Sequence, residues 1–298
     1  MSGEPAVTDT VGKSVSAACL NCGTVLSGPF CSQCGQRAIG AYPTVREMIG
    51  DVWQELWGWD GRLVRTVRLL LRRPGALTVE VMEGRRARYV SPVRLYLLAS
   101  VVYFLCAASV PTVRTPDPAP QPGQKSGVVR LNPSGRPTGL TAAQRAEALK
   151  DLERRPWWLQ AVLRPIVEDP EGYRLRYLQA LPRVLFVLVP VFACIVSLFC
   201  WHRPFPQHLI FAVHLHTAIF AFLTVGELSQ LTRSPIIVDL IELGVTVGIV
   251  VYGCTAFRRV YRESWWRVFP KAVGIAFIYG IVGVIALLAT MIIAARLP

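Results

Sequence analysis

Charged side chains are scarce in this sequence of 298 residues, where they make up 17% of the total against the roughly 25% usual in soluble domains. Hydrophobic residues make up 52%, and the mean hydropathy is +0.40. This balance is unusual for a soluble protein and indicates that much of the chain lies in lipid. The length allows about two domains, at roughly 150 residues each.

The first 40 residues lack the apolar core that a secretory signal requires. We therefore expect this region to stay in the cytosol, where thiols remain reduced and serve as metal ligands rather than disulfide partners. We expect residues 1–18 to form a short, polar, disordered tail.

Signatures of catalysis are also missing. The sequence has no phosphate-binding loop, no nucleophile with a placed base and no paired carboxylates in a recognisable active-site context. The chain is therefore expected not to be an enzyme. Its net charge of +13 does not indicate nucleic acid as a partner, because the basic residues gather beside apolar stretches. That placement favours a bilayer with anionic lipids.

What the chain does have is a cysteine quartet, Cys19-x2-Cys22-x8-Cys31-x2-Cys34. Two CxxC knuckles in a polar region are typical of a tetrahedral zinc site. A glycine follows each knuckle, which permits the sharp turn that points backbone N–H groups at the thiolates. The sequence predicts a small zinc ribbon over residues 19–36, with a structural zinc ion; the alternative is two unligated cysteine pairs.

Five stretches are long and apolar enough to cross a bilayer, which needs about 18 or more such residues. They predict a multi-pass membrane domain over residues 94–298. The expected spans are 95–113, 184–201, 209–226, 240–257 and 272–295.

Between the ribbon and the first span lies a region, 41–93, that is basic and amphipathic. Apolar residues recur there at helical spacing with arginines among them, which predicts a helix lying in the membrane interface and ending before Pro74-Gly75. Its arginines either recognise lipid head groups or simply set topology, and the second reading is favoured. The candidates for head-group contact are Arg72, Arg73, Arg85, Arg86 and Arg88.

Orientation follows from the short loops. The loop 258–271 carries five basic residues and one acidic residue, so its net charge is 5 − 1 = +4. A loop of this charge should face the cytosol. The loop 227–239 should lie outside, and five spans then put the N-terminus in the cytosol. The long loop 114–183, with a disordered linker over 115–139, lies outside in this scheme. It would be cytosolic if the first span were instead a re-entrant hairpin.

Ionisable residues near or within the spans are candidates for function, because burying them in lipid is costly. One reading is a polar track for protons, ions or a ligand; the other, which we favour, is histidines that bridge helices and acids at the water boundary. His214 and His216 are two residues apart, so they should face nearly opposite sides of one helix. The candidates are His208, His214, His216, Glu227, Asp239 and Glu242.

Several runs resemble a family of uncharacterised bacterial membrane proteins, the domain-of-unknown-function family 3667. The resemblance rests on the second knuckle, on two short motifs before the first span, and on motifs in the second and third spans. These runs are Phe30–Gln36, Leu71–Gly75, Glu83–Pro92, Leu181–Pro190 and His208–His216. The resemblance implies a zinc ribbon, a multi-pass domain in the bacterial cytoplasmic membrane and no assigned reaction.

The predicted fold is thus an all-α membrane bundle of about five transmembrane helices, with an N-terminal zinc ribbon and a basic interfacial helix. We expect a non-enzymatic anchoring, sensing or partner-binding protein whose ribbon binds a cytosolic protein. One alternative is a transporter or an ion- or ligand-binding channel that uses the third and fourth spans. A third, less favoured alternative is an enzyme that acts on lipid. Glycines at Gly244-x3-Gly248 allow close helix contact, either within the bundle or in a homo-oligomer.

Overall fold

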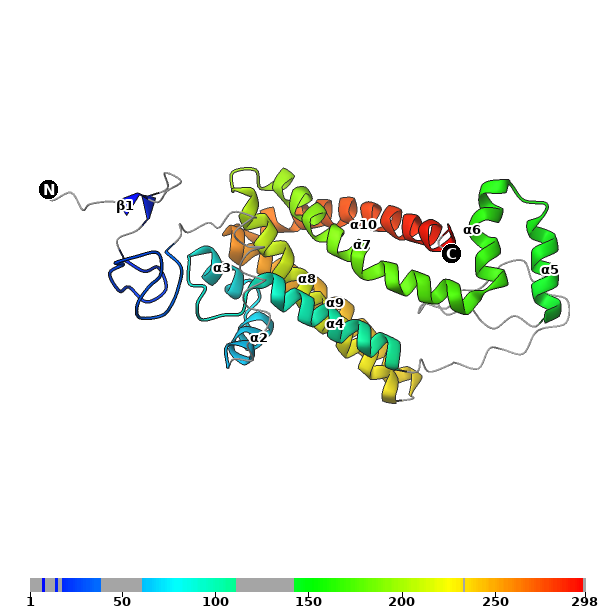
Figure 1. Cartoon of the computed structure of the whole chain (residues 1–298), viewed down its shortest axis with the longest axis horizontal. Coiled ribbons are helices and arrows are strands. Elements are labelled where there is room, and N and C mark those ends of the chain that lie inside the picture. The colour runs from blue at the N-terminus through cyan, green and yellow to red at the C-terminus, as the bar shows by residue number, and fades with distance from the viewer. Residues whose placement is uncertain are drawn as a thin grey trace. The chain divides into compact units, whose positions relative to one another are not determined.

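The structure is a computed structural model that describes residues 7–8, 14–15, 18–38, 61–110, 142–232 and 234–296 (Figure 1). The expected linker 115–139 and residues 41–60 of the predicted interfacial region lie outside these ranges. The elements are β1 Val7–Thr8, β2 Ser14–Val15, α2 Arg62–Arg72, α3 Ala76–Met82, α4 Pro92–Ser109, α5 Ala142–Leu152, α6 Trp157–Glu168, α7 Pro170–Phe199, α8 Phe205–Ser229, α9 Pro235–Tyr261 and α10 Trp265–Arg296. Within the N-terminal residues expected to be a tail, β1 and β2 pair antiparallel.

Five helices are long and apolar enough to cross a membrane, so the chain is a multi-pass membrane protein. These helices begin several residues before the predicted spans. The predicted spans were limited to uncharged residues, whereas a helix can continue through a charged residue at its end. Proline at the first turn starts α4 after Ser91 and α9 after Ser234. The spans are Pro92–Ser109, Leu175–Phe199, Phe205–Thr232, Pro235–Tyr261 and Trp265–Ala295.

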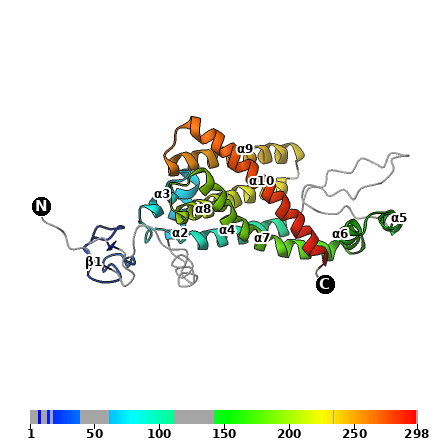
Figure 2. The same cartoon turned by 90° about the horizontal axis from the view of Figure 1, so that it is seen from above.

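The chain divides into two compact units, and α7 and α10 contribute to both. The first unit holds residues 1–110 and 189–276, and α8 is its central helix. Of the most apolar window of α8, 56% is buried, against 11–33% for the other four spans. It packs against α4 and α9 along their lengths and against α2 and α3 (Figure 1 and Figure 2). The core of this unit therefore forms around α8.

A tight elbow joins α2 to α3. Helix α2 ends at Arg72, before Pro74-Gly75 as predicted. Gly75 has φ +75°, and a Cβ there would lie 2.8 Å from the carbonyl oxygen of Ala256 in α9, so only glycine fits this approach. The Tyr252 hydroxyl of α9 donates to the Leu70 carbonyl at 2.8 Å. Helix α3, which the sequence did not predict, then packs against α8 and α9, so this part of the interfacial region belongs to the bundle.

One end of this unit gathers the loop before α4 and the end of α9. Arg262, directly after α9, lies 3.7 Å from Glu83 in the loop that follows α3. The start of α4 and the end of α9 therefore lie at the same end of the bundle. Helix α4 runs without a break from Pro92 to Ser109, which favours a span over the re-entrant hairpin.

The second unit contains α5, α6, the first part of α7 and the last part of α10. Its core includes Ile166, Tyr173 and Ala294, and the rings of Tyr173 and Tyr177 stack at 6.3 Å. The Arg176 Nε donates to the Ala294 carbonyl at 3.1 Å, which joins α7 to the end of α10.

Candidate metal centre

The two CxxC knuckles are built alike. In the first, Cys19 N–H donates to the Thr24 carbonyl and Gly23 N–H to the Cys19 carbonyl, both at 2.8 Å. Twelve residues on, Cys31 N–H donates to the Gln36 carbonyl and Gly35 N–H to the Cys31 carbonyl. Both glycines have positive φ, +79° and +70°. The same glycine-containing turn therefore occurs in both knuckles, and each turn carries two cysteine thiols.

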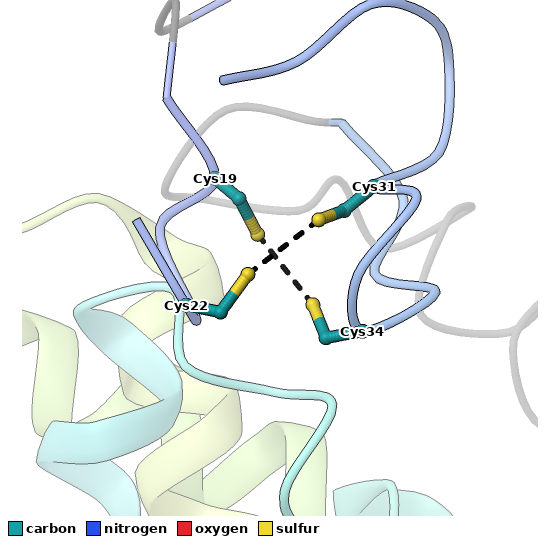
Figure 3. A group of neighbouring side chains, drawn as sticks. All are labelled: Cys19, Cys22, Cys31 and Cys34. Carbon is teal, nitrogen blue, oxygen red and sulfur yellow. Dashed lines mark hydrogen bonds between the residues drawn. The ribbon is translucent and has the colours of Figure 1, made fainter. Parts of the chain in front are cut away.

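The four sulfur atoms converge on one point (Figure 3). All lie within 4.8 Å of one another; Cys19 Sγ is 3.7 Å from Cys34 Sγ, and Cys22 Sγ is 3.5 Å from Cys31 Sγ. Ligands at about 2.3 Å from a tetrahedral ion lie about 3.8 Å apart. The sulfur spacing is therefore that of a tetrahedral four-thiolate site, and the cluster can hold a metal ion.

The surroundings of the thiols set their acidity. Burial raises the pKa of Cys19 to about 11. Hydrogen bonding to the side chain of Thr24, whose hydroxyl oxygen lies 3.3 Å from Cys22 Sγ, lowers the pKa of Cys22 to about 6. Cys22 is therefore largely a thiolate at neutral pH, whereas a cation must displace the Cys19 proton when it binds.

The side chain of Gln36 in the ribbon forms three hydrogen bonds with the loop between α3 and α4. Gln36 Nε2 donates to the Gly84 carbonyl at 2.8 Å. Gln36 Oε1 accepts from the backbone N–H groups of Arg86 and Ala87, both at 3.1 Å. One side chain thereby satisfies three backbone groups of the loop. We call this contact the Gln36 clamp.

Two further contacts support the clamp. Arg88 Nη2 donates to the Asn21 carbonyl in the first knuckle at 2.9 Å. Gly84 has φ +86°, and a Cβ there would lie 2.6 Å from Leu20 Cδ1. Both knuckles therefore contact the loop between α3 and α4.

The same loop is fixed to the helices on its other side. The Val90 N–H donates to Thr66 Oγ1 of α2 at 3.0 Å. Arg85 forms a bidentate pair with Glu80 of α3, at 2.7 and 2.8 Å, and also pairs with Glu83. This arginine lowers the pKa of Glu80. The loop thus connects the ribbon, α2, α3 and the start of α4.

These contacts divide the arginines predicted to meet lipid. Arg85 and Arg88 have protein partners, and the backbone of Arg86 belongs to the Gln36 clamp. Arg72 and Arg73 are exposed at the end of α2. To bind lipid, the Arg85 and Arg88 side chains would have to leave these partners, whereas the clamp uses only the backbone of Arg86.

The three histidines of the predicted polar track are buried in α8 and contact different elements. His214 Nδ1 lies 3.0 Å from the Thr78 hydroxyl of α3, and His208 Nδ1 lies 2.8 Å from the Tyr261 hydroxyl of α9. His216 Nδ1 lies 2.8 Å from the Ala212 carbonyl, and its ring meets that of Phe192 in α7. His214 and His216 therefore face different helices, and two of the three histidines bridge α8 to a neighbour.

The acids of that track lie away from the histidines. Glu227 is in the last turns of α8, and Glu242 Oε1 accepts from Gln230 Nε2 at 3.0 Å. Asp239 is in the second turn of α9 and is exposed. Their role stays a prediction.

The fold and the cluster define a class: a multi-pass membrane protein that carries a four-cysteine cluster fitted to a metal ion. Residues 60–104 match the family described as "Protein of unknown function (DUF3667)". This match covers α2, α3, the clamped loop and most of α4, and it supports the family resemblance over that part of the chain. No curated protein and no solved structure matches the chain.

Proposed function

We propose that the chain is a non-enzymatic protein of the bacterial cytoplasmic membrane, anchored by its bundle, whose cytosolic zinc ribbon binds a protein partner. The Gln36 clamp is the observation that carries this proposal. A head on a flexible tether would need no specific contact with the bundle, whereas three hydrogen bonds from one side chain hold this head against the loop before the first span.

Zinc is the metal that the donor set favours. Four thiolates in tetrahedral array suit zinc or an iron–sulfur centre, and a site closed by four protein ligands is typical of structural zinc. The ribbon has almost no apolar core, since Cys19 and Cys31 are its buried hydrophobic residues. Metal binding therefore supplies most of its folding free energy, as in other small zinc modules.

The ribbon also offers apolar side chains to a partner. Val25 is 76% exposed and Phe30 is 59% exposed, and each lies at the margin of a knuckle. Side chains of this kind on a small head are typical of protein contact. Because the head is clamped beside α4, a partner bound there would be held at the membrane surface.

The test is amide hydrogen exchange on the full chain in lipid nanodiscs, with metal content measured in parallel. We expect one zinc ion per chain and slow exchange at the Arg86 and Ala87 amides, which the clamp protects. Cys31→Ser should abolish zinc binding, unfold the ribbon and expose those amides. Slow exchange that persists in Cys31→Ser would contradict a metal-dependent clamp, and absence of zinc from the native protein would refute the zinc assignment.

The transporter alternative rests on the buried histidines. The side-chain partners of His208 and His214 favour helix bridging, because each hydrogen bond replaces water that a transport path would need. His216→Asn decides between the two: normal folding with lost solute flux would support transport.

A further inference from the structure

Helix α2 presents two parallel stripes on its exposed side. Val64, Val67 and Leu71 are spaced i, i+3 and i+7, and they are 72%, 36% and 40% exposed. Each is followed by an arginine, so a basic stripe runs beside the apolar one, rotated by about 100°. The exposed arginines of this second stripe are Arg65, Arg68 and Arg72.

The helix cannot turn to hide these stripes, because its opposite side is fixed. Thr66 and Leu70 are 0% and 3% exposed. The Thr66 hydroxyl accepts from the Val90 N–H, and the Leu70 carbonyl accepts from the Tyr252 hydroxyl. The two stripes therefore have a fixed orientation on the bundle, because α2 cannot rotate about its axis without breaking these hydrogen bonds.

Charge on this surface is of one sign. The sequence of α2, Arg62–Arg72, contains no acidic residue. Within the part of the chain that the structure describes, no carboxylate pairs with Arg65, Arg68 or Arg72, whereas Arg85 has two such partners. The guanidinium groups of this stripe are thus available to an anion from outside.

The position of α2 in the bundle indicates which kind of anion can reach its arginines. At the elbow after α2, Arg259 of α9 donates to the Pro74 carbonyl. Arg258, in the same turn of α9, lies over the ring of Trp265 at 4.9 Å, and Trp266 is 91% exposed. Exposed tryptophans at the end of a span are characteristic of the membrane–water interface. Helix α2 is therefore fixed to the end of the bundle where lipid head groups lie.

We propose that α2 binds anionic phospholipid: its arginine stripe, Arg65, Arg68 and Arg72, pairs with head-group phosphates while Val64, Val67 and Leu71 enter the acyl region beside them. Arginine suits this role because its planar donors meet phosphate oxygens in pairs. Of the head-group contacts predicted from the sequence, the proposal keeps Arg72, and it adds Arg65 and Arg68 in place of Arg85, Arg86 and Arg88. It does not depend on the metal site or on the ribbon's partner.

The experiment measures binding of short-chain phosphatidylglycerol to the detergent-solubilised full chain, with short-chain phosphatidylcholine and inorganic phosphate as comparison ligands. The variant Arg68→Gln/Arg72→Gln removes two charges from the stripe. Its charge-matched control is Arg155→Gln/Arg164→Gln, two exposed arginines of the second unit that pair with Asp151 and Glu168.

We expect saturable binding of phosphatidylglycerol that weakens at least tenfold in Arg68→Gln/Arg72→Gln and stays within twofold in the control. Val64→Ser/Val67→Ser, which keeps the charge, should weaken it as well, because the acyl contact is lost. Equal loss in both arginine pairs would reduce the effect to net charge and overturn the proposal. Equal affinity for phosphatidylcholine, or binding of free phosphate as tight as that of the lipid, would overturn it too. Unchanged elution and metal content verify that each variant is folded.

Discussion

The side-chain amide of Gln36 meets the backbone of Gly84 across 48 residues of sequence, with Nε2 2.8 Å from the carbonyl oxygen. Gln36 is two residues beyond the last cysteine of the cluster, and Gly84 is eight residues before the start of α4. This contact therefore joins the four-cysteine ribbon to the loop that leads into α4. The loop can keep these hydrogen bonds only while the second knuckle holds Gln36 in place.

Gln36→Glu and Gln36→Ala should separate the two halves of the clamp. Glutamate still accepts from the Arg86 and Ala87 amides but cannot donate to the Gly84 carbonyl, whereas alanine loses all three bonds. At about 0.5–1.5 kcal/mol per hydrogen bond, alanine should expose both amides to fast exchange and glutamate should give an intermediate rate. Zinc content should stay at the native level in both variants. Exchange rates in Gln36→Ala equal to those of the native protein would show that Gln36 does not protect the Arg86 and Ala87 amides.

Metal binding to the ribbon should weaken as the pH falls, because each thiol must lose its proton to become a ligand. Cys19, whose pKa burial raises to about 11, is protonated in the free site at all pH values near neutrality. Cys22, with its pKa lowered to about 6, adds a further proton only below that value. The affinity should therefore fall steadily from pH 8 to 6 and more steeply below 6. Competition with a colorimetric zinc chelator measures it, and an affinity independent of pH would argue against thiolate ligation.

Gly75→Ala should destabilise the bundle. The substitution forces a side chain onto φ +75° and places its Cβ 2.8 Å from the Ala256 carbonyl oxygen, a backbone atom that cannot rotate away. Strain and overpacking of this kind cost about 1–3 kcal/mol each. The thermal midpoint in detergent should fall clearly. The matched control is Gly244→Ala in α9, where an added Cβ meets nothing within 4 Å, and the midpoint should hold or rise.

The parts of this structure that the sequence predicted are those with local signals. The cysteine spacing predicted a cluster, and uncharged length predicted five membrane-spanning helices, both of which the structure has. Helix α3 was missed because seven residues are too few to show helical periodicity. The Gln36 clamp was missed because its partners lie far away in sequence, although Gln36 stood in the motif on which the family resemblance rests.

The role of the buried histidines was predicted only in outline for the same reason. Spacing indicated that His214 and His216 face apart, but it could not show that the partner of His214 would be Thr78 in an unpredicted helix. Partners supplied by tertiary packing leave no trace in the local sequence.

Thr78→Val and His214→Asn should each lower stability modestly. The pair is buried between α3 and α8, and measured hydrogen bonds within membrane proteins average about 0.6 kcal/mol with a maximum near 1.7. A double-mutant cycle on thermal stability in detergent should return a coupling energy in that range. A coupling of zero would mean that the two side chains do not interact. Selective loss of a transport activity at His216→Asn, with normal folding, would instead favour the transporter.

The two ends of α9 should lie on opposite sides of the membrane. The ion pair between Arg262 and Glu83 puts the loop after α9 at the same end as the clamped ribbon, while Ser234 precedes α9 at the other end. The net positive charge of the 258–271 loop predicts that this first end faces the cytosol. In intact cells, a membrane-impermeant maleimide should label Ser234→Cys. It should reach Ser264→Cys only after permeabilisation, with the unsubstituted chain as the background for native thiols. Labelling of both positions from outside would contradict the single crossing of α9. Labelling of Ser264→Cys alone would invert the topology and put the four-cysteine ribbon outside.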